Sequence, residues 1–170
     1  MRHRRLPRFD LPHHTYYLTC CLHNRRPLLR SARSAQTLLD LYAGYRNRGD
    51  ILLHGYVIMP DHYHVIVTLV RQPSVGGLVR RIHSAFARRW RAWAGDEAPA
   101  LRQHPHGRIW QRRFYDHVIR DEEDWRTKLS YMHGNPVEAA IVPRATDYPW
   151  SSAAFWETGT GPVTCDSIIW

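Results

Sequence analysis

Two histidines in one short segment could hold a metal ion. His62 and His64 lie two residues apart in a β-branched and aromatic run, 62–69, which predicts a strand. Residues two apart in a strand share a face, so the two imidazoles should project together while Tyr63 and Val65 point into a core. The pair could ligate a metal, or the two rings could be exposed strand histidines.

The rest of the sequence limits which metal chemistry this pair could serve. A histidine-triad hydrolase would need histidine at Ile66, and a cupin would need a glutamate a few residues on, whereas the next one is Glu97. A zinc deaminase would need H-x-E and P-C-x-x-C motifs, and the sequence has neither. His104 and His106 form a second H-x-H pair, but in a loop without apolar support. These enzyme classes are excluded, and a third ligand has to come from elsewhere.

A tyrosine and an asparagine on one predicted helix could complete a phosphate-processing site. The helix should begin at the capping residue Asp121, run to about Gly134 and stop at Asn135-Pro136. Tyr131 and Asn135 are four residues apart and therefore share a face. A tyrosine phenol can attack a phosphodiester, and a metal held by two imidazoles and an amide oxygen can polarise the same phosphate.

The same residue types have structural interpretations too. Tyr131 could pack at the rim of the core, and Asn135 could cap the end of its helix. Tyr115 and Tyr148 are competing nucleophiles. Tyr115 ranks second because it falls in a predicted strand, with no asparagine or glutamine one helical turn further on.

The charge of the chain favours a polyanionic partner. Its 24 Lys+Arg exceed its 15 Asp+Glu, which gives a net charge of +9, and every basic residue except Lys128 is arginine. The excess lies in the first two-thirds, because residues 121–170 hold three basic and eight acidic groups. Arginine richness by itself fits a solvated surface equally well, so position must decide.

One predicted helix, 74–93, concentrates this charge on one side. Leu78, Ile82 and Phe86 lie on one arc, and Arg89 falls among them. Four arginines share the opposite arc: Arg80, Arg81, Arg88 and Arg91. Without a carboxylate among them they repel each other unless an anion neutralises them, which predicts phosphate contacts. The other expected DNA contacts are Lys128 and the basic N-terminal arm (about 1–12) with Arg2, Arg4, Arg5 and Arg8.

The elements that must position these residues suggest an α+β fold. Predicted strands cover 15–22, 52–59, 62–69 and 109–119, and predicted helices cover 34–48, 74–93 and 121–134. Pro60-Asp61 should turn the second strand into the third, and 94–107 should be a loop. This order predicts one antiparallel sheet with helices packed on it. We expect a single catalytic domain over 1–170, with an irregular C-terminal tail (about 143–170).

Several classes of protein are not expected. The sequence has no apolar run of about 18 residues and no signal peptide, so we expect a cytoplasmic protein without a membrane partner. Three cysteines without a C-x-x-C spacing argue against a disulfide framework or a structural zinc site. No P-loop motif occurs, so no nucleotide cofactor is expected.

Four sequence blocks resemble a known family. They are MPDHYH (59–64), WQRRFYDHVIR (110–120), YMHGNPVEAAIV (131–142) and YPWSS (148–152). In this order they are similar to the REP-associated tyrosine transposases of bacteria, single-tyrosine HUH nucleases related to insertion-sequence transposases. The resemblance implies a ferredoxin-like fold, His62 and His64 as metal ligands, Tyr131 as nucleophile and Asn135 as third ligand.

Three positions depart from the family pattern. Tyr63 stands where the middle residue of the HUH motif is usually aliphatic. Glu138 and Ala140 stand where relatives commonly have a basic residue and a glycine. The fit of DNA after the active-site helix could therefore differ from that of the relatives.

The leading interpretation is a metal-dependent transposase. Using Mg²⁺ or Mn²⁺, it would cleave and rejoin single-stranded or hairpin DNA through a covalent 5′-phosphotyrosine, as a monomer or a homodimer. The resemblance implies that the DNA is a hairpin-forming repeat with a short guide sequence at its foot. The alternative is a non-catalytic DNA- or RNA-binding module that keeps the fold and the arginine surface.

Overall fold

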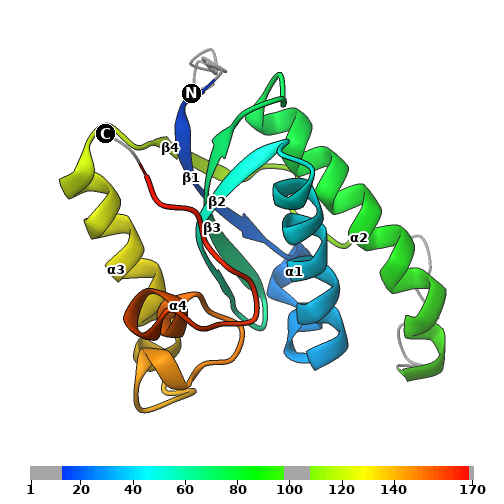
Figure 1. Ribbon diagram of the computed structural model, residues 1–170. Helices are drawn as coiled ribbons and strands as arrows, with labels where there is room; N and C mark the ends of the chain where they lie inside the picture. The colour runs from blue at the N-terminus through cyan, green and yellow to red at the C-terminus, as the bar shows by residue number, and fades with distance from the viewer. Residues whose placement is uncertain (1–12, 98–107, 169–170) are drawn as a thin grey trace, which may run out of the picture.

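The computed structural model describes residues 13–97 and 108–168, which form a four-stranded sheet with helices on both faces (Figure 1). The strands are β1 (Thr15–Cys21), β2 (Ile51–Ile58), β3 (His62–Leu69) and β4 (Tyr115–Val118). The helices are α1 (Ala32–Asn47), α2 (Val75–Glu97), α3 (Glu122–Glu138) and α4 (Ala153–Thr158), with short 3₁₀ turns at His23–Arg25, Leu28–Arg30 and Ala145–Asp147. The strand order is β2-β3-β1-β4, and neighbouring strands are antiparallel. The predicted antiparallel α+β fold is confirmed, and the succession βαββαβ is ferredoxin-like.

The sheet separates two helical layers. In Figure 1, α1 and α2 lie on one side of the sheet and α3 lies on the other. Alternate residues of β3 serve the two sides: Val65 and Val67 belong to the larger core with α1 and α2, whereas Ile66 belongs to the smaller core with Met132 of α3. His62 and His64 have the parity of Ile66, so they belong to the α3 side of the sheet.

The predicted hairpin is present, and it sets the position of the histidine pair. Ile58 pairs with Tyr63, and the Met59 amide donates to the His62 carbonyl oxygen at 2.9 Å. Pro60 and Asp61 form the turn between them, as their residue types predict. His62 therefore begins β3 directly after the turn, and His64 follows two residues later on the same face.

Three predicted boundaries were wrong. Trp110 makes only an isolated bridge to Leu22, so the strand expected over 109–119 is limited to β4. The loop expected from 94 begins later because α2 continues to Glu97. The C-terminal tail, expected to be irregular, contains α4, whose Trp156 indole donates to the His54 carbonyl oxygen at 2.9 Å.

The predicted end of the helix that carries Tyr131 and Asn135 was also wrong, since α3 continues through Pro136 to Glu138. A proline in the last turn removes one backbone donor, and its carbonyl still accepts from Ile141 at 2.9 Å. The chain turns away from the helix after the C-cap residue Ala139, at Ala140, whose φ of 52° lies in the left-handed region. Asn135 is therefore a residue inside the helix, one turn after Tyr131, and does not stop it.

Ala140→Gly should stabilise the protein, because a left-handed alanine is strained and a glycine at this position is not. We expect the free energy of unfolding to rise by about 1 kcal/mol. Thermal or urea denaturation measures the change. Ala139→Gly is the matched control, because Ala139 has a negative φ of −80° and a glycine there should be destabilising. A fall in stability with Ala140→Gly would show that the helix end is not under strain.

Gly55 allows α3 to lie close against the sheet. A Cβ atom at Gly55 would lie 2.5 Å from Met132 Cε and 2.7 Å from Leu129 Cδ1. Gly55→Val should therefore force these two side chains to move, and because Met132 is fully buried, it should lower the free energy of unfolding by about 1–3 kcal/mol, as overpacking of a core does. Gly44→Ala in α1 is the control and should not lower the free energy of unfolding. The nearest atom to the Cβ that it adds is Arg48 Nη1, at an ordinary contact distance of 3.5 Å. Equal denaturation midpoints for Gly55→Val and the unchanged protein would contradict the close packing.

Candidate active site

A cavity of about 580 Å³ opens between α3 and the sheet. It is lined from β1, β3, β4 and α3, and from the 3₁₀ turn after β1, by Tyr17, Thr19, Arg25, His62, His64, Tyr115, Thr127, Lys128, Tyr131 and Asn135. The four residues that the sequence singled out for chemistry, Tyr131, Asn135 and the two histidines, all line this cavity. They come from two elements, β3 and α3, which are separated in the chain by α2 and β4.

Each histidine of the pair is held through its Nδ1 atom. The His62 Nδ1 group donates to the Asp61 carboxylate at 2.6 Å. The His64 Nδ1 atom lies 2.7 Å from Tyr17 Oη and 2.8 Å from Thr19 Oγ1. Contacts of this kind fix the ring orientation of metal-binding histidines and leave Nε2 as the ligating atom.

The His64 ring is in the state that metal binding requires. Burial, with a smaller contribution from the neighbouring His62, lowers the pKa of His64 to about 3, although the Asn135 side chain opposes the shift. The imidazole is therefore neutral at neutral pH. Its Nε2 atom is buried and has no hydrogen-bond partner of good geometry among the described residues. A buried acceptor without a partner is costly, and a bound cation would satisfy it.

Tyr131 and Asn135 face the histidines from α3. The Tyr131 ring is 52% exposed, and its centroid lies 5.9 Å from that of His64. Asn135 Nδ2 donates to the Tyr131 carbonyl oxygen at 2.8 Å, which leaves the amide oxygen available as a ligand. Their position follows from the Asp121 cap, which accepts from the Asp124 amide at 2.8 Å, and from the burial of Met132 against the sheet.

The donor set suits a divalent cation. Within residues 13–97 and 108–168, no three His, Cys, Asp or Glu side chains are grouped so as to hold a metal. A metal between His62 and His64 would therefore take its third protein ligand from Asn135. Two neutral imidazoles and one amide oxygen leave coordination positions for phosphate oxygens, as catalytic sites require.

Several residues of the cavity were not predicted. Tyr17 and Thr19 reach His64 because β1 pairs with β3 in the register that sets Thr19 opposite His64. Arg25 bonds Asp61 at 3.2 Å, so the carboxylate that holds His62 is itself held. Asp61 could have been predicted, because it stands beside His62 in the MPDHYH block. Tyr17, Thr19 and Arg25 could not, because their contacts with the site depend on pairing between distant segments.

The three tyrosines considered as nucleophiles are in different environments. Tyr148 is buried, donates to the Ile58 carbonyl oxygen at 2.7 Å, and has its pKa raised to about 12 by burial. This phenol holds the loop before α4 against the sheet and is removed as a candidate. Tyr115 on β4 is 54% exposed and lines the cavity, so it remains a competitor of Tyr131.

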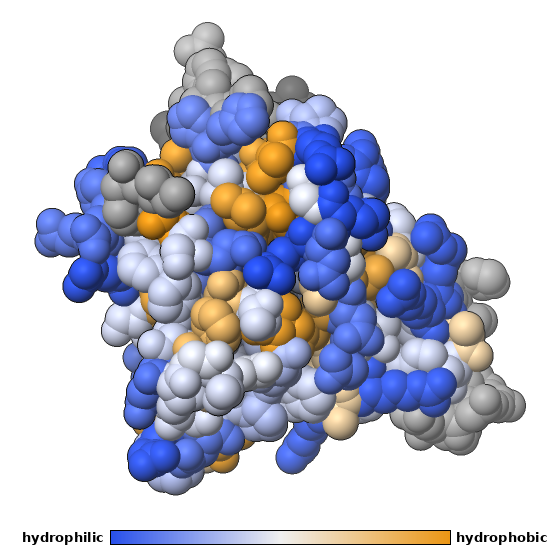
Figure 2. All heavy atoms as spheres, in the orientation of Figure 1, coloured by the Kyte–Doolittle hydropathy of each residue, from blue (hydrophilic) through white to orange (hydrophobic). Residues whose placement is uncertain are grey.

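The predicted DNA contacts are in different places. Lys128 lines the cavity, with its Nζ 5.7 Å from the centre of the Tyr17 ring. Arg80, Arg81, Arg88 and Arg91 are exposed on α2, which lies on the other side of the sheet (Figure 1). Figure 2 shows hydrophilic side chains over this side of the molecule, at the right. Arg2, Arg4, Arg5 and Arg8 lie outside the described residues.

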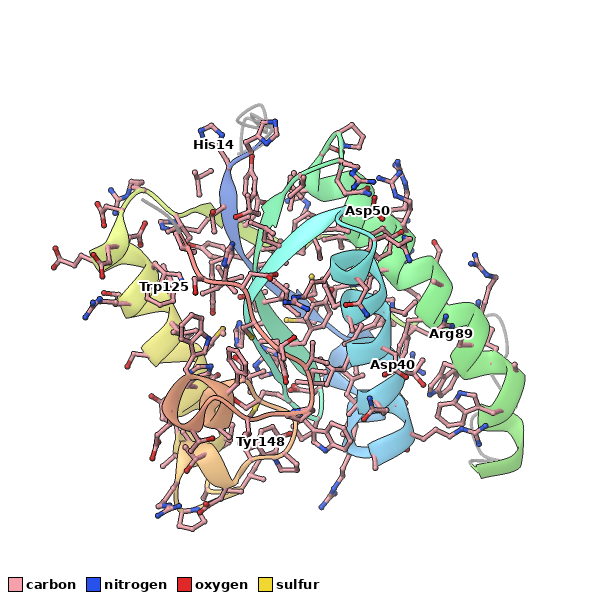
Figure 3. The ribbon with its side chains drawn as sticks, in the orientation of Figure 1. His14, Asp40, Asp50, Arg89, Trp125 and Tyr148 are labelled. Atoms are coloured by element: carbon pink, nitrogen blue, oxygen red, sulfur yellow. The ribbon has the colours of Figure 1, made fainter. Side chains whose placement is uncertain are left out.

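Arg89 was expected to point toward packed residues, and this expectation was wrong, because the side chain is exposed. The C-terminal end of α2 lies farther from the sheet than its first turns (Figure 1), and Arg89 lies in this second half (Figure 3). The helical arc alone does not bury a residue where the neighbouring layer has ended.

Comparison with known proteins gives one family. Residues 11–135 match the family described as IS200-like transposases. A REP-associated tyrosine transposase of Escherichia coli K12 is 29% identical over 140 residues, which cover 81% of this chain and 75% of that protein. A solved structure of a REP-associated tyrosine transposase bound to a REP hairpin superposes with a TM-score of 0.70 at 25% identity, covering 98% of this chain and 99% of that one. No helix of the described residues is long and apolar enough to cross a membrane. The match over residues 11–135 shows that the chain belongs to the IS200-like transposase family, and the similar proteins relate it to the REP-associated tyrosine transposases.

Proposed function

We propose that this protein cleaves and rejoins single-stranded DNA at a metal site, with Tyr131 as the nucleophile. The observation that carries the proposal is the meeting of Tyr131, His62, His64 and Asn135 in one cavity. A DNA-binding module without catalysis would not need a half-exposed phenol beside a histidine whose Nε2 is buried without a partner. The family relationship supports the same assignment.

The proposed reaction is a transesterification. The Tyr131 phenol loses its proton to water, which reaches the half-exposed ring, and its oxygen attacks the scissile phosphorus. The bond from phosphorus to the 3′ oxygen breaks, and that oxygen takes a proton to become a 3′-hydroxyl. A phosphotyrosine on the 5′ end is left. Attack by a 3′-hydroxyl on this linkage rejoins a strand, so no nucleotide triphosphate is consumed.

The chain offers ligands for a metal and a fixed positive charge. A divalent ion, Mg²⁺ or Mn²⁺, bound by His62, His64 and Asn135 would polarise the scissile phosphate. Asp61, Tyr17 and Thr19 hold the two imidazoles so that their Nε2 atoms are available to that ion. The Lys128 ammonium lies in the same cavity and would offset the charge that develops on the phosphate oxygens.

The substrate that we propose is a hairpin-forming repeat. The relative in the solved complex binds a REP hairpin, and the present chain matches nearly all of that relative's length. The exposed arginines of α2 lie across the sheet from the cavity, so they would contact DNA away from the scissile phosphate. Their contribution stays a prediction, as does that of the N-terminal arm.

Covalent capture tests this function. Protein, Mn²⁺ and an end-labelled DNA hairpin with single-stranded flanks should give a labelled band at the protein's mass that survives SDS. The band should not form in EDTA, because the phosphate would then lack its polarising cation. Retardation of the DNA on a native gel without any SDS-stable band would favour the non-catalytic binding module instead.

A further inference from the structure

A second cavity, of about 520 Å³, lies between the first half of α2 and the segment 111–114 that precedes β4. Its lining includes Ser74, Arg80, His83 and Ser84 of the α2 region and Gln111 and Arg112 of the segment. None of these residues belongs to the candidate active site. The question is which ligand such a cavity fits.

The charge of this cavity favours an anion. Arg80 and Arg112 come from different elements, and both side chains are exposed. Within the described part of the chain, no acidic residue lines the cavity. Among the same described residues, neither Arg80 nor Arg112 takes part in an ion pair. Two guanidinium groups around one polar cavity are a typical arrangement for phosphate recognition. Ser84 and Gln111 add neutral donors beside them.

The wall between the two elements is fixed. The His83 ring stacks on Trp110 with centroids 4.0 Å apart and an angle of 6° between the planes. Its Nε2 atom lies 2.9 Å from Tyr63 Oη, and burial lowers the pKa of His83 to about 3. The ring is therefore neutral and held from two sides. The cavity has a rigid wall, and its charge comes from the two arginines.

The second cavity is next to the candidate active site along the chain. Arg112 lines the second cavity and Tyr115 lines the first. Three residues of backbone span at most about 11 Å between these Cα atoms. The strand that follows, β4, is an edge strand of the sheet. A ligand that passes around its free edge therefore goes from the α3 side of the sheet to the α2 side. A flexible polyanion that leaves the active site across β4 would reach Arg112 within a few nucleotides.

We propose that the second cavity binds the single-stranded DNA that flanks the cleavage point, through phosphates held by Arg80 and Arg112. The proposal rests on the proposed function and extends it, because it assigns a binding site beyond the reacting phosphate. Its contacts are with phosphates, so it adds affinity for a flank of any sequence. It also gives Arg80 a role that differs from that of the other α2 arginines.

Binding measurements with two DNAs test the proposal. Both DNAs carry the same hairpin, and one of them also has single-stranded flanks of six nucleotides. The Tyr131→Phe variant serves as background, so that no strand is cut during the titration. Adding Arg80→Ala and Arg112→Ala should lower affinity for the flanked DNA at least fivefold and for the bare hairpin less than twofold. The slope of log affinity against log salt should flatten by about 1.4 for the flanked DNA, the value for two single-strand phosphates.

Matched variants separate the cavity from general charge. Arg48→Ala with Arg144→Ala removes the same charge from exposed positions elsewhere, and should leave the advantage of the flanked DNA intact. Arg80→Lys with Arg112→Lys keeps the charge and should retain most of the affinity. Equal weakening by the Arg48 and Arg144 pair, or equal weakening on the bare hairpin, would overturn the proposal. Thermal denaturation checks folding, and the single substitutions Arg80→Gln and Arg112→Gln replace the pair if it unfolds.

The proposed function and this proposal can fail separately. The protein with native Tyr131, tested in parallel for the SDS-stable adduct, reports on the function alone. An adduct that forms while the arginine pair has no flank-specific effect rejects the second site only. A flank-specific effect without any adduct rejects the covalent function and leaves a DNA-binding site.

Discussion

Tyr131→Phe should abolish DNA cleavage while leaving DNA affinity nearly unchanged. Only the attacking oxygen is removed, and the ring can still lie beside His64 at the rim of the cavity. We expect the rate of cleavage to fall at least about a thousandfold, as for the loss of a covalent nucleophile in other enzymes. Affinity should change less than twofold. Single-turnover cleavage of a labelled hairpin and fluorescence anisotropy measure the two quantities.

Tyr115→Phe is the matched control for this prediction. Tyr115 lines the same cavity and is as exposed as Tyr131, so it offers a phenol of similar access. It lies on β4 and has no amide one helical turn away. Cleavage should survive Tyr115→Phe. Loss of cleavage in Tyr115→Phe together with full cleavage in Tyr131→Phe would reverse the assignment of the nucleophile.

His62→Ala should remove metal-dependent cleavage by removing one of two imidazole ligands. We expect the affinity for Mn²⁺ to fall at least about a hundredfold, since changes in the contacts behind metal ligands alone cost 10–100-fold. Electron paramagnetic resonance of free Mn²⁺ measures the affinity without any DNA. Asp61→Asn should give a smaller loss, because it weakens the hold on His62 Nδ1 but keeps both rings.

The control for the metal prediction is another histidine. His23 does not line the cavity, and His23→Ala should leave the affinity for Mn²⁺ unchanged. Equal Mn²⁺ affinity in His62→Ala and the unchanged protein would mean that the pair does not hold the metal. In that case His62 and His64 would be ordinary strand histidines.

The parts of the fold that could be predicted depend on the order of residue types within short segments of the sequence. The alternation from His62 to Leu69 was sufficient to assign the face of each histidine, because the period of a strand is local. The Pro60-Asp61 turn between two apolar runs was sufficient to predict the hairpin. The spacing of Tyr131 and Asn135 placed both on one face of a helix, although the helix was expected to end there.

The parts that could not be predicted depend on contacts between distant segments. Thr19 reaches His64 only through the register of β1 with β3, which no local pattern encodes. Arg89 is exposed because of where α2 diverges from the sheet, and the arc of a helix does not contain that information. Pro136 lies within α3 because the helix is held by Met132 packing against the sheet, which offsets the loss of one backbone hydrogen bond.

The most direct measurement is to locate the covalent linkage. The SDS-stable adduct formed with Mn²⁺ is treated with nuclease and trypsin, and its peptides are sequenced by mass spectrometry. Trypsin cuts after Lys128 and Arg144, so Tyr131 lies in peptide 129–144, and it cuts after Arg113 and Arg120, so Tyr115 lies in peptide 114–120. We predict a phosphonucleotide on Tyr131 in peptide 129–144. A nucleotide on Tyr115, or cleaved DNA with a free 5′-phosphate and no modified peptide, would contradict the proposed mechanism.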